Sequence, residues 1–193
     1  MARDRATRPE ARPVRLFVAV EIPEPARDVA WKAFAPWREE FPRARWVPRE
    51  NWHVTLKFLG ATWPRLLDWV VEEVGGVARG GRAFEARLGG VGAFPSLGRA
   101  RVLWAGVEDR SGAMPELAAA LDASLAREFK AEKRAFRSHL TVARSEPPLK
   151  LSEAFASTGL ESQRFTVERL VLYRSHLQRP APRYETLRSF PLG

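Results

Sequence analysis

Two copies of one short pattern constrain the fold of this chain more than any other feature. HVTL occupies residues 53–56 and HLTV occupies residues 139–142, so two of the three histidines have a threonine two positions later. With seven threonines in 193 residues, a random scatter would produce this pairing in about 0.4% of such chains. The repetition after 86 residues therefore indicates two similar lobes, each contributing one strand.

Each copy lies where apolar and polar residues alternate, as in a half-buried β-strand. In residues 51–60 the even positions are mostly apolar, whereas the odd positions carry His53, Thr55 and Lys57. A solvent-facing strand would explain one such polar face. Two matched faces favour a shared cleft, with a hydroxyl beside each imidazole because residues i and i+2 project from the same side. We expect Lys57, near the strand end, to be turned to water.

Two imidazoles and two hydroxyls suit an in-line displacement at a phosphodiester. One neutral histidine can take a proton from the attacking oxygen while a protonated one gives a proton to the leaving oxygen. A histidine pKa near 6.5 allows both forms near neutrality. The hydroxyls of Thr55 and Thr141 can donate to the non-bridging oxygens, where charge accumulates.

Composition narrows the class of protein. The chain has no cysteine, which excludes disulfides, thiol catalysis and thiolate metal sites and fits a reducing compartment. No run approaches the roughly 20 apolar residues that span a bilayer. The N-terminal MARDRATRPEARPVR is charged from its start, unlike a signal peptide. We therefore expect a cytoplasmic protein that does not associate with membranes, and nothing requires more than a monomer.

The net charge of +9 points to an anionic partner. Arginine outnumbers lysine by 27 to 5, and guanidinium groups match phosphate oxygens well. A GC-rich genome or a thermophilic origin would also favour arginine. Neither explains the excess of positive charge by itself, so charge alone leaves nucleic acid, another phosphorylated ligand and no such ligand all open.

Predicted strands and helices alternate along the chain. The predicted strands are residues 15–22, 51–59, 82–95, 99–107, 138–144, 163–175 and 183–192. The predicted helices are residues 25–41, a segment from Pro64 that the Gly75-Gly76 pair should end, and residues 114–130. The pattern indicates an α+β fold with several antiparallel strands and about three helices.

No recognisable cofactor or metal motif occurs. GGVGAF lacks the Lys-Ser/Thr of a phosphate-binding loop and the spacing of a dinucleotide fingerprint. Histidines and carboxylates show no zinc-like spacing. We expect no metal ion and no cofactor. His176 has no threonine at the +2 position, so we expect it to be exposed and non-catalytic.

The two tetrapeptides resemble the paired H-x-T-x motifs of the 2H phosphoesterase superfamily. Flanking segments are similar, in the same order, to one branch, the RNA 2′,3′-cyclic phosphodiesterases once called 2′-5′ RNA ligases. These segments are RLFVAVEIP, RWVPRENWHVTLKFLG, RVLWAGV, FRSHLTVAR, LYRSHL and YETLRSFPL. The resemblance runs from about residue 14 to the end, with Ser138 at a position where the branch commonly has proline.

The resemblance implies a fold and a reaction. The expected fold is a bilobal α+β 2H phosphoesterase domain at residues 14–193, pseudo-twofold symmetric, with two antiparallel sheets facing a central cleft and helices outside. Residues 1–13 would be a flexible basic tail. The expected reaction is metal-independent hydrolysis of an RNA 2′,3′-cyclic phosphate to a 2′-phosphomonoester. The substrate would be a tRNA-like or other RNA fragment.

The resemblance also implies residue roles. His53 would be the general acid that protonates the departing 3′-oxygen, and His139 the general base that activates water. The same groups in reverse could perform 2′-5′ RNA ligation. Arg144 matches an arginine of the branch and would bind substrate, although an offset of five from His139 requires the strand to end, twist or bulge.

Two alternatives share these features. Other 2H phosphodiesterases act on different cyclic or 2′-5′-linked nucleotides and carry the same four motif residues. A non-catalytic RNA-binding module would use the same positive charge and could stack a terminal base on aromatic residues, which the sequence does not single out.

Overall fold

The computed structural model describes residues 12–193. Most of the predicted tail at residues 1–13 therefore lies outside the described residues, and the first strand begins at Val14. The boundary of the single domain stays a prediction. None of the helices in residues 12–193 is long and apolar enough to cross a membrane.

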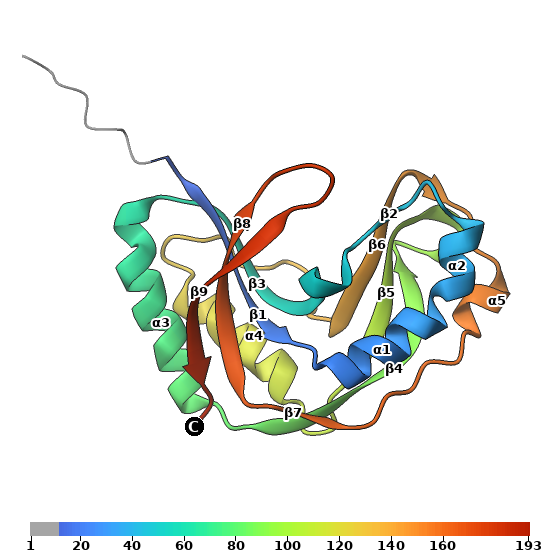
Figure 1. Ribbon diagram of the computed structural model, residues 1–193. Helices are drawn as coiled ribbons and strands as arrows, with labels where there is room; N and C mark the ends of the chain where they lie inside the picture. The colour runs from blue at the N-terminus through green and yellow to red at the C-terminus, as the bar shows by residue number, and fades with distance from the viewer. Residues whose placement is uncertain (1–11) are drawn as a thin grey trace, which may run out of the picture.

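In residues 12–193, nine strands form two antiparallel sheets that make up the two lobes (Figure 1). The four-stranded sheet has the order β3 (His53–Thr62), β1 (Val14–Glu21), β8 (Arg169–His176) and β9 (Arg183–Pro191). The five-stranded sheet has the order β2 (Arg45–Trp46), β6 (His139–Leu149), β5 (Ala100–Glu108), β4 (Phe84–Phe94) and β7 (Phe165–Val167). Strands β3 and β6, which begin with the two motif histidines, contact each other across the lobes.

Helices cover the outer faces of the sheets (Figure 1). On the four-stranded sheet lie α3 (Leu67–Gly80) and α4 (Ala113–Ser124), which contact each other and the strands beneath them. Beside the five-stranded sheet lie α1 (Glu24–Ala33), α2 (Ala35–Glu40) and α5 (Glu153–Ala156). Short 3-10 turns occur at η1 (Arg49–Asn51), η2 (Pro64–Leu66) and η3 (Leu97–Arg99). The predicted α+β fold, with two antiparallel sheets and helices outside, is confirmed.

The chain crosses between the lobes repeatedly. Helix α4 follows β5 and precedes β6, both in the five-stranded sheet, yet it packs on β3 of the other sheet. Helix α1 follows β1 of the four-stranded sheet but contacts β4 of the five-stranded one. Each lobe is therefore built from interleaved segments.

Two of the predicted helices differ from the structure in their extent. The helix expected at residues 25–41 is divided at Phe34, because Pro36 has no N–H with which to continue α1. The helix expected at residues 114–130 ends at Ser124. Helix α2 is the second part of the helix expected at residues 25–41, whereas the short α5 was not expected.

The Gly75-Gly76 pair does not end its helix. Helix α3 continues to Gly80. Its packing on β8 and β9 outweighs the low helix propensity of glycine, which costs about 1 kcal/mol per residue relative to alanine. A Cβ at Gly75 would lie 3.5 Å from the Phe190 ring, an ordinary van der Waals distance, so this packing does not itself require glycine.

Both motif strands contain a bulge three residues after the histidine. The pairing of β3 with β1 skips Leu56, and the pairing of β6 with β5 skips Val142. An extra residue reverses the alternation of faces beyond it. The two strands therefore change their polar and apolar sides at equivalent positions.

The first bulge overturns the expectation that Lys57 faces water. Its side chain is 1% exposed and points toward α4, where it forms an ion pair with Asp122. The ammonium also donates to the Lys130 carbonyl oxygen at 2.7 Å. Burial of the charge is thus compensated by partners on the segment that leads to the second motif.

We expect the two halves of this pair to have unequal effects on stability. Asp122→Ala leaves the Lys57 ammonium buried without its anion and should lower the free energy of unfolding by about 3–5 kcal/mol. Lys57→Met fills the same space with apolar atoms and leaves Asp122, whose side chain is 22% exposed, able to hydrate. The Lys57→Met variant should lower the free energy of unfolding by about 1 kcal/mol.

Urea unfolding of both variants measures the difference. Glu146→Ala is the matched control, because it removes the acid of an exposed pair with Arg101 and should cost less than about 1 kcal/mol. Equal losses for the two Lys57–Asp122 variants would contradict a role for the buried pair.

Candidate active site

The two motif histidines are held in the same way. His53 Nδ1 lies 2.7 Å from the carbonyl oxygen of Asn51, and His139 Nδ1 lies 2.7 Å from that of Arg137. A carbonyl oxygen only accepts, so each Nδ1 carries the proton and donates it. In the neutral rings, Nε2 is therefore the atom that can accept a proton. The carbonyl two residues earlier thus sets the tautomer of both imidazoles.

The first threonine contacts its histidine directly. Thr55 Oγ1 lies 3.0 Å from His53 Nε2, as expected for residues on one strand face. Thr141 lies two residues after His139 on β6, is half-buried and pairs in register with Trp104 of β5. Both threonines thus lie on the strand face of their histidines, and within residues 12–193 the hydrogen bond between threonine and imidazole is made by Thr55.

His53 is strongly destabilised in its charged form. Burial lowers the pKa of His53 to about 4. The nearby positive charges of Arg27, Arg144 and His139 act in the same direction, whereas the hydrogen bond to the Asn51 carbonyl opposes them. Without a bound anion, His53 is neutral at pH 7.

His139 has the same tendency. Burial lowers the pKa of His139 below its ordinary value, and the charges of Arg144 and Arg137 lower it further. The Arg137 carbonyl favours the protonated ring but does not offset these effects. Both imidazoles are consequently in an electropositive, partly dehydrated setting.

Arg144 lies close enough to both histidines for its charge to lower their pKa values. The bulge at Val142 accounts for this position, because it turns the fifth residue after His139 back toward the cleft. Arg144 is exposed and has no carboxylate within 4.0 Å in the part of the chain that the structure describes. Its guanidinium is thus available to an anion between the lobes.

Aromatic side chains that the sequence reasoning did not identify surround His53. The ring of Phe17 stacks on the imidazole with centroids 4.8 Å apart, and the Tyr184 ring meets it edge-on at 5.2 Å. Tyr173 lies 6.1 Å away. These are the only two tyrosines of the chain, brought together by β1, β8 and β9. The parity of residues 15–22 could have placed Phe17 on one face, but not beside His53.

A second aromatic group surrounds His139. Phe94 meets the imidazole edge-on at 5.1 Å and Trp104 lies at 6.5 Å. The guanidinium of Arg137 lies over both rings, at 5.5 and 5.6 Å. Trp104 lies across Gly92, where any Cβ would come within 2.2 Å of the indole. Each histidine therefore has its own aromatic support from its own sheet.

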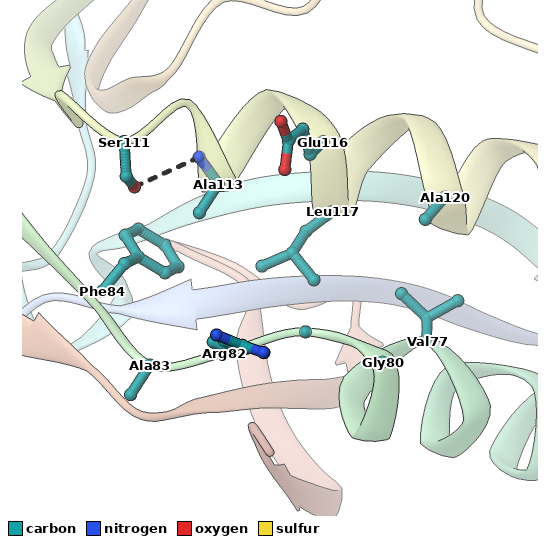
Figure 2. Close-up of a pocket in the computed structure, with 11 residues that line it drawn as sticks. Val77, Gly80, Arg82, Ala83, Phe84, Ser111, Ala113, Glu116, Leu117 and Ala120 are labelled. Atoms are coloured by element: carbon teal, nitrogen blue, oxygen red, sulfur yellow. Dashed lines mark hydrogen bonds between the residues drawn. The ribbon is translucent and has the colours of Figure 1, made fainter.

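Other candidate positions lie elsewhere. His176 Nε2 contacts Glu185 at 2.6 Å on the β8–β9 hairpin and has no part in the pair. Figure 2 shows a cavity of about 610 Å³ at the ends of α3 and α4, lined by Val77, Phe84 and Leu117 among others. It contains none of the predicted site residues. Within residues 12–193 no three His, Cys, Asp or Glu side chains gather as metal ligands.

Comparisons with known proteins identify the family of this chain. Residues 26–179 match the model of the 2′-5′ RNA ligase superfamily. An RNA 2′,3′-cyclic phosphodiesterase of Methanothermobacter thermautotrophicus is 33% identical over 189 residues, covering 93% of this chain and 99% of that protein. One of Geobacillus stearothermophilus is 31% identical over 179 residues, or 91% of this chain, but this chain spans only 56% of its length.

Solved structures share the fold. A crystal structure of a Thermus thermophilus protein superimposes with a TM-score of 0.77 at 31% identity, covering 92% of this chain and 97% of that one. Escherichia coli LigT in its apo form gives a TM-score of 0.72 at 27% identity, with coverages of 94% and 98%. Because the family model matches most of this chain, the chain belongs to the 2′-5′ RNA ligase superfamily of 2H phosphoesterases.

Proposed function

We propose that this protein is an RNA 2′,3′-cyclic phosphodiesterase that works by two-histidine acid/base catalysis without a metal ion. The observation that carries the proposal is the matched pair of imidazoles, each with Nδ1 bonded to a main-chain carbonyl and Nε2 able to exchange a proton. The relatives that bear this activity in their names support the choice of substrate.

In the proposed reaction, His139 Nε2 accepts a proton from water as the water oxygen attacks phosphorus. The bond from phosphorus to the 3′-oxygen breaks, and His53 Nε2–H donates its proton to that oxygen. The product carries a 2′-phosphomonoester and a free 3′-hydroxyl. His139 ends protonated and His53 neutral, and solvent restores both. Each proton transfer contributes about 10²–10⁴ in rate.

The remaining site residues bind the phosphate. Arg144 would hold two of its oxygens with its guanidinium fork, and Thr141 would donate its hydroxyl to a non-bridging oxygen. Thr55, bonded to His53 Nε2, would orient that ring and donate to the phosphate when the ring turns its proton to the 3′-oxygen. These groups act where negative charge increases in the transition state.

The substrate itself would convert His53 into an acid. In the free protein burial keeps this ring neutral. A phosphate anion placed beside it favours the imidazolium and raises its pKa. Since Arg144 lies near both rings, the anion would also offset the guanidinium charge that otherwise opposes protonation.

The same groups could also perform 2′-5′ ligation. With a 5′-hydroxyl in place of water, His139 would accept its proton as the 5′-oxygen attacks phosphorus, and His53 would protonate the departing 3′-oxygen, which leaves a 2′-5′ bond. The reversed roles, with His53 as base and His139 as acid, would cleave that bond and restore the cyclic phosphate.

The decisive test is the position of the product phosphate. A short RNA ending in a 2′,3′-cyclic phosphate, incubated with the protein in EDTA, should give a 2′-phosphate by phosphorus NMR. A 3′-phosphate would reverse the proposed orientation of the substrate. Loss of activity in EDTA with recovery on adding magnesium or zinc would refute the metal-free mechanism. No reaction at all would favour another cyclic or 2′-5′-linked nucleotide as substrate, or RNA binding without catalysis.

Replacement of either histidine should abolish most turnover. His53→Ala and His139→Ala should each lower kcat at least about 10²-fold, because each removes a proton-transfer group. His176→Ala, which removes the one remaining histidine, is the control and should retain wild-type turnover. Near-normal activity in either motif variant would rule out the mechanism, provided that the circular dichroism spectra match.

The pH profile should show the lowered pKa values. The active form needs His53 protonated, a fraction that falls as pH rises through its pKa, and His139 neutral, a fraction that falls as pH decreases. Both pKa values lie below 6.5 in the free protein, so kcat/KM should reach its maximum below pH 6.5. The alkaline limb of kcat should lie at higher pH, because the bound phosphate raises the pKa of His53. An alkaline limb of kcat/KM above pH 7 would contradict this assignment.

A further inference from the structure

A second hollow, of about 670 Å³, lies along β3 beyond the histidine and takes no part in the proposed chemistry. Its walls are the end of β3, the segment that follows it and residues 128–134, which connect α4 to β6. The side chains that matter for its chemistry are Phe58, Trp63, Arg65, Lys130, Lys133 and Arg134.

Two aromatic rings in this groove are unusually exposed. Phe58 is 48% exposed and Trp63 is 47% exposed, and they are two of the four exposed large apolar side chains of residues 12–193. Neighbouring exposed aromatics on a folded surface commonly mark a binding site. Aromatic faces stack on nucleic-acid bases of any sequence.

The charge of the groove is positive. Four basic residues line it against two acidic ones, Glu128 and Glu132, and Glu128 lies 3.5 Å from Arg127 outside the lining. The guanidinium of Arg15 lies over the Phe58 ring at 5.2 Å. Exposed aromatics interleaved with cations are the combination that binds single-stranded nucleic acid.

The groove lies along the far end of the strand that begins with His53. The bulge at Leu56 places Phe58 on the same side of β3 as Thr55, and Phe58 pairs with Phe17, whose ring stacks on His53. Five residues of strand separate His53 from Phe58, which is about 15 Å at the usual rise per residue. The distance suits the next nucleotides of a chain whose end is held at the histidines.

The far wall of the groove is fixed before any ligand binds. The buried Lys57 ammonium holds the Lys130 carbonyl, and the Asp122 carboxylate accepts the Glu132 N–H at 3.1 Å. The connection between α4 and β6 is thus fastened to the strand that carries His53. A preformed wall lowers the ordering cost of binding.

We infer that this groove binds the RNA strand on the 5′ side of the cyclic phosphate. The cyclic phosphate ends the RNA, so every other nucleotide must leave the catalytic site on that one side. Arg65, Lys133 and Arg134 would contact backbone phosphates, and a base would stack on Phe58 or Trp63. The inference rests on the proposed function and adds a binding site to it.

Substrates of two lengths test the groove. A nucleoside 2′,3′-cyclic monophosphate occupies only the histidine site, whereas a hexanucleotide with the same end also reaches the groove. Trp63→Ala and Arg134→Ala should each lower kcat/KM for the hexanucleotide about tenfold relative to the mononucleotide. Arg82→Ala, which removes an exposed arginine at the cavity of Figure 2, is the matched control and should leave the ratio unchanged.

Direct binding separates failure of the groove from failure of the proposed function. Binding of the hexanucleotide to the His139→Ala protein should depend on salt, and adding Arg134→Ala should reduce the slope of log K against log salt by about 0.7. Adding Arg82→Ala should leave the slope unchanged. If neither groove variant alters the length ratio or the salt slope, the inference is wrong even where hydrolysis proceeds. If the protein hydrolyses no substrate, the salt dependence of hexanucleotide binding alone decides whether the groove binds RNA.

Discussion

A one-residue bulge, placed three positions after each histidine, determines which side chains of the two motif strands face the cleft. Before the bulge, His53 and Thr55 share a face, and beyond it the parity changes so that Lys57 enters the core and Phe58 emerges. In the second strand the same irregularity turns Arg144 toward the histidines. In strands without the bulge, Lys57 would face the phosphate and Arg144 would be buried. Both the core and the site therefore depend on the one residue in each strand that has no partner in the neighbouring strand.

The sequence was sufficient for most of the strands and for the place of both motif histidines at strand starts, because period-two alternation and a repeated tetrapeptide are local signals. The strand expected at residues 163–175 instead divides into β7 and β8, which lie in different sheets. It was insufficient wherever tertiary packing overrides local preference. Gly75 lies inside a helix because α3 packs on β8 and β9, and Lys57 is buried because Asp122 lies beneath it. The resemblance to known enzymes named Arg144, and only the register of β6 explains how that residue reaches the cleft.

The aromatic surroundings of the histidines were beyond sequence reasoning for a different reason. Phe17, Tyr173 and Tyr184 come from three strands spread along the chain, and their meeting at one imidazole is a property of sheet order. Their packing dehydrates His53 and thereby lowers its pKa. In each of the two imidazoles, a main-chain carbonyl fixes the proton on Nδ1. The carbonyls thus orient the imidazoles and favour their protonated forms, whereas burial has the larger effect and lowers both pKa values.

The interleaving of the lobes has a consequence for how such a chain can be assembled. Helix α4 lies against the four-stranded sheet although the strands on either side of it in sequence lie in the other sheet. Contacts between residues distant in sequence must form before helices cover either sheet. A topology of this kind folds slowly compared with helical bundles. The two similar halves are consequently not detachable modules: a ribosome that has completed only the first motif has not yet made the helix on which that motif strand rests.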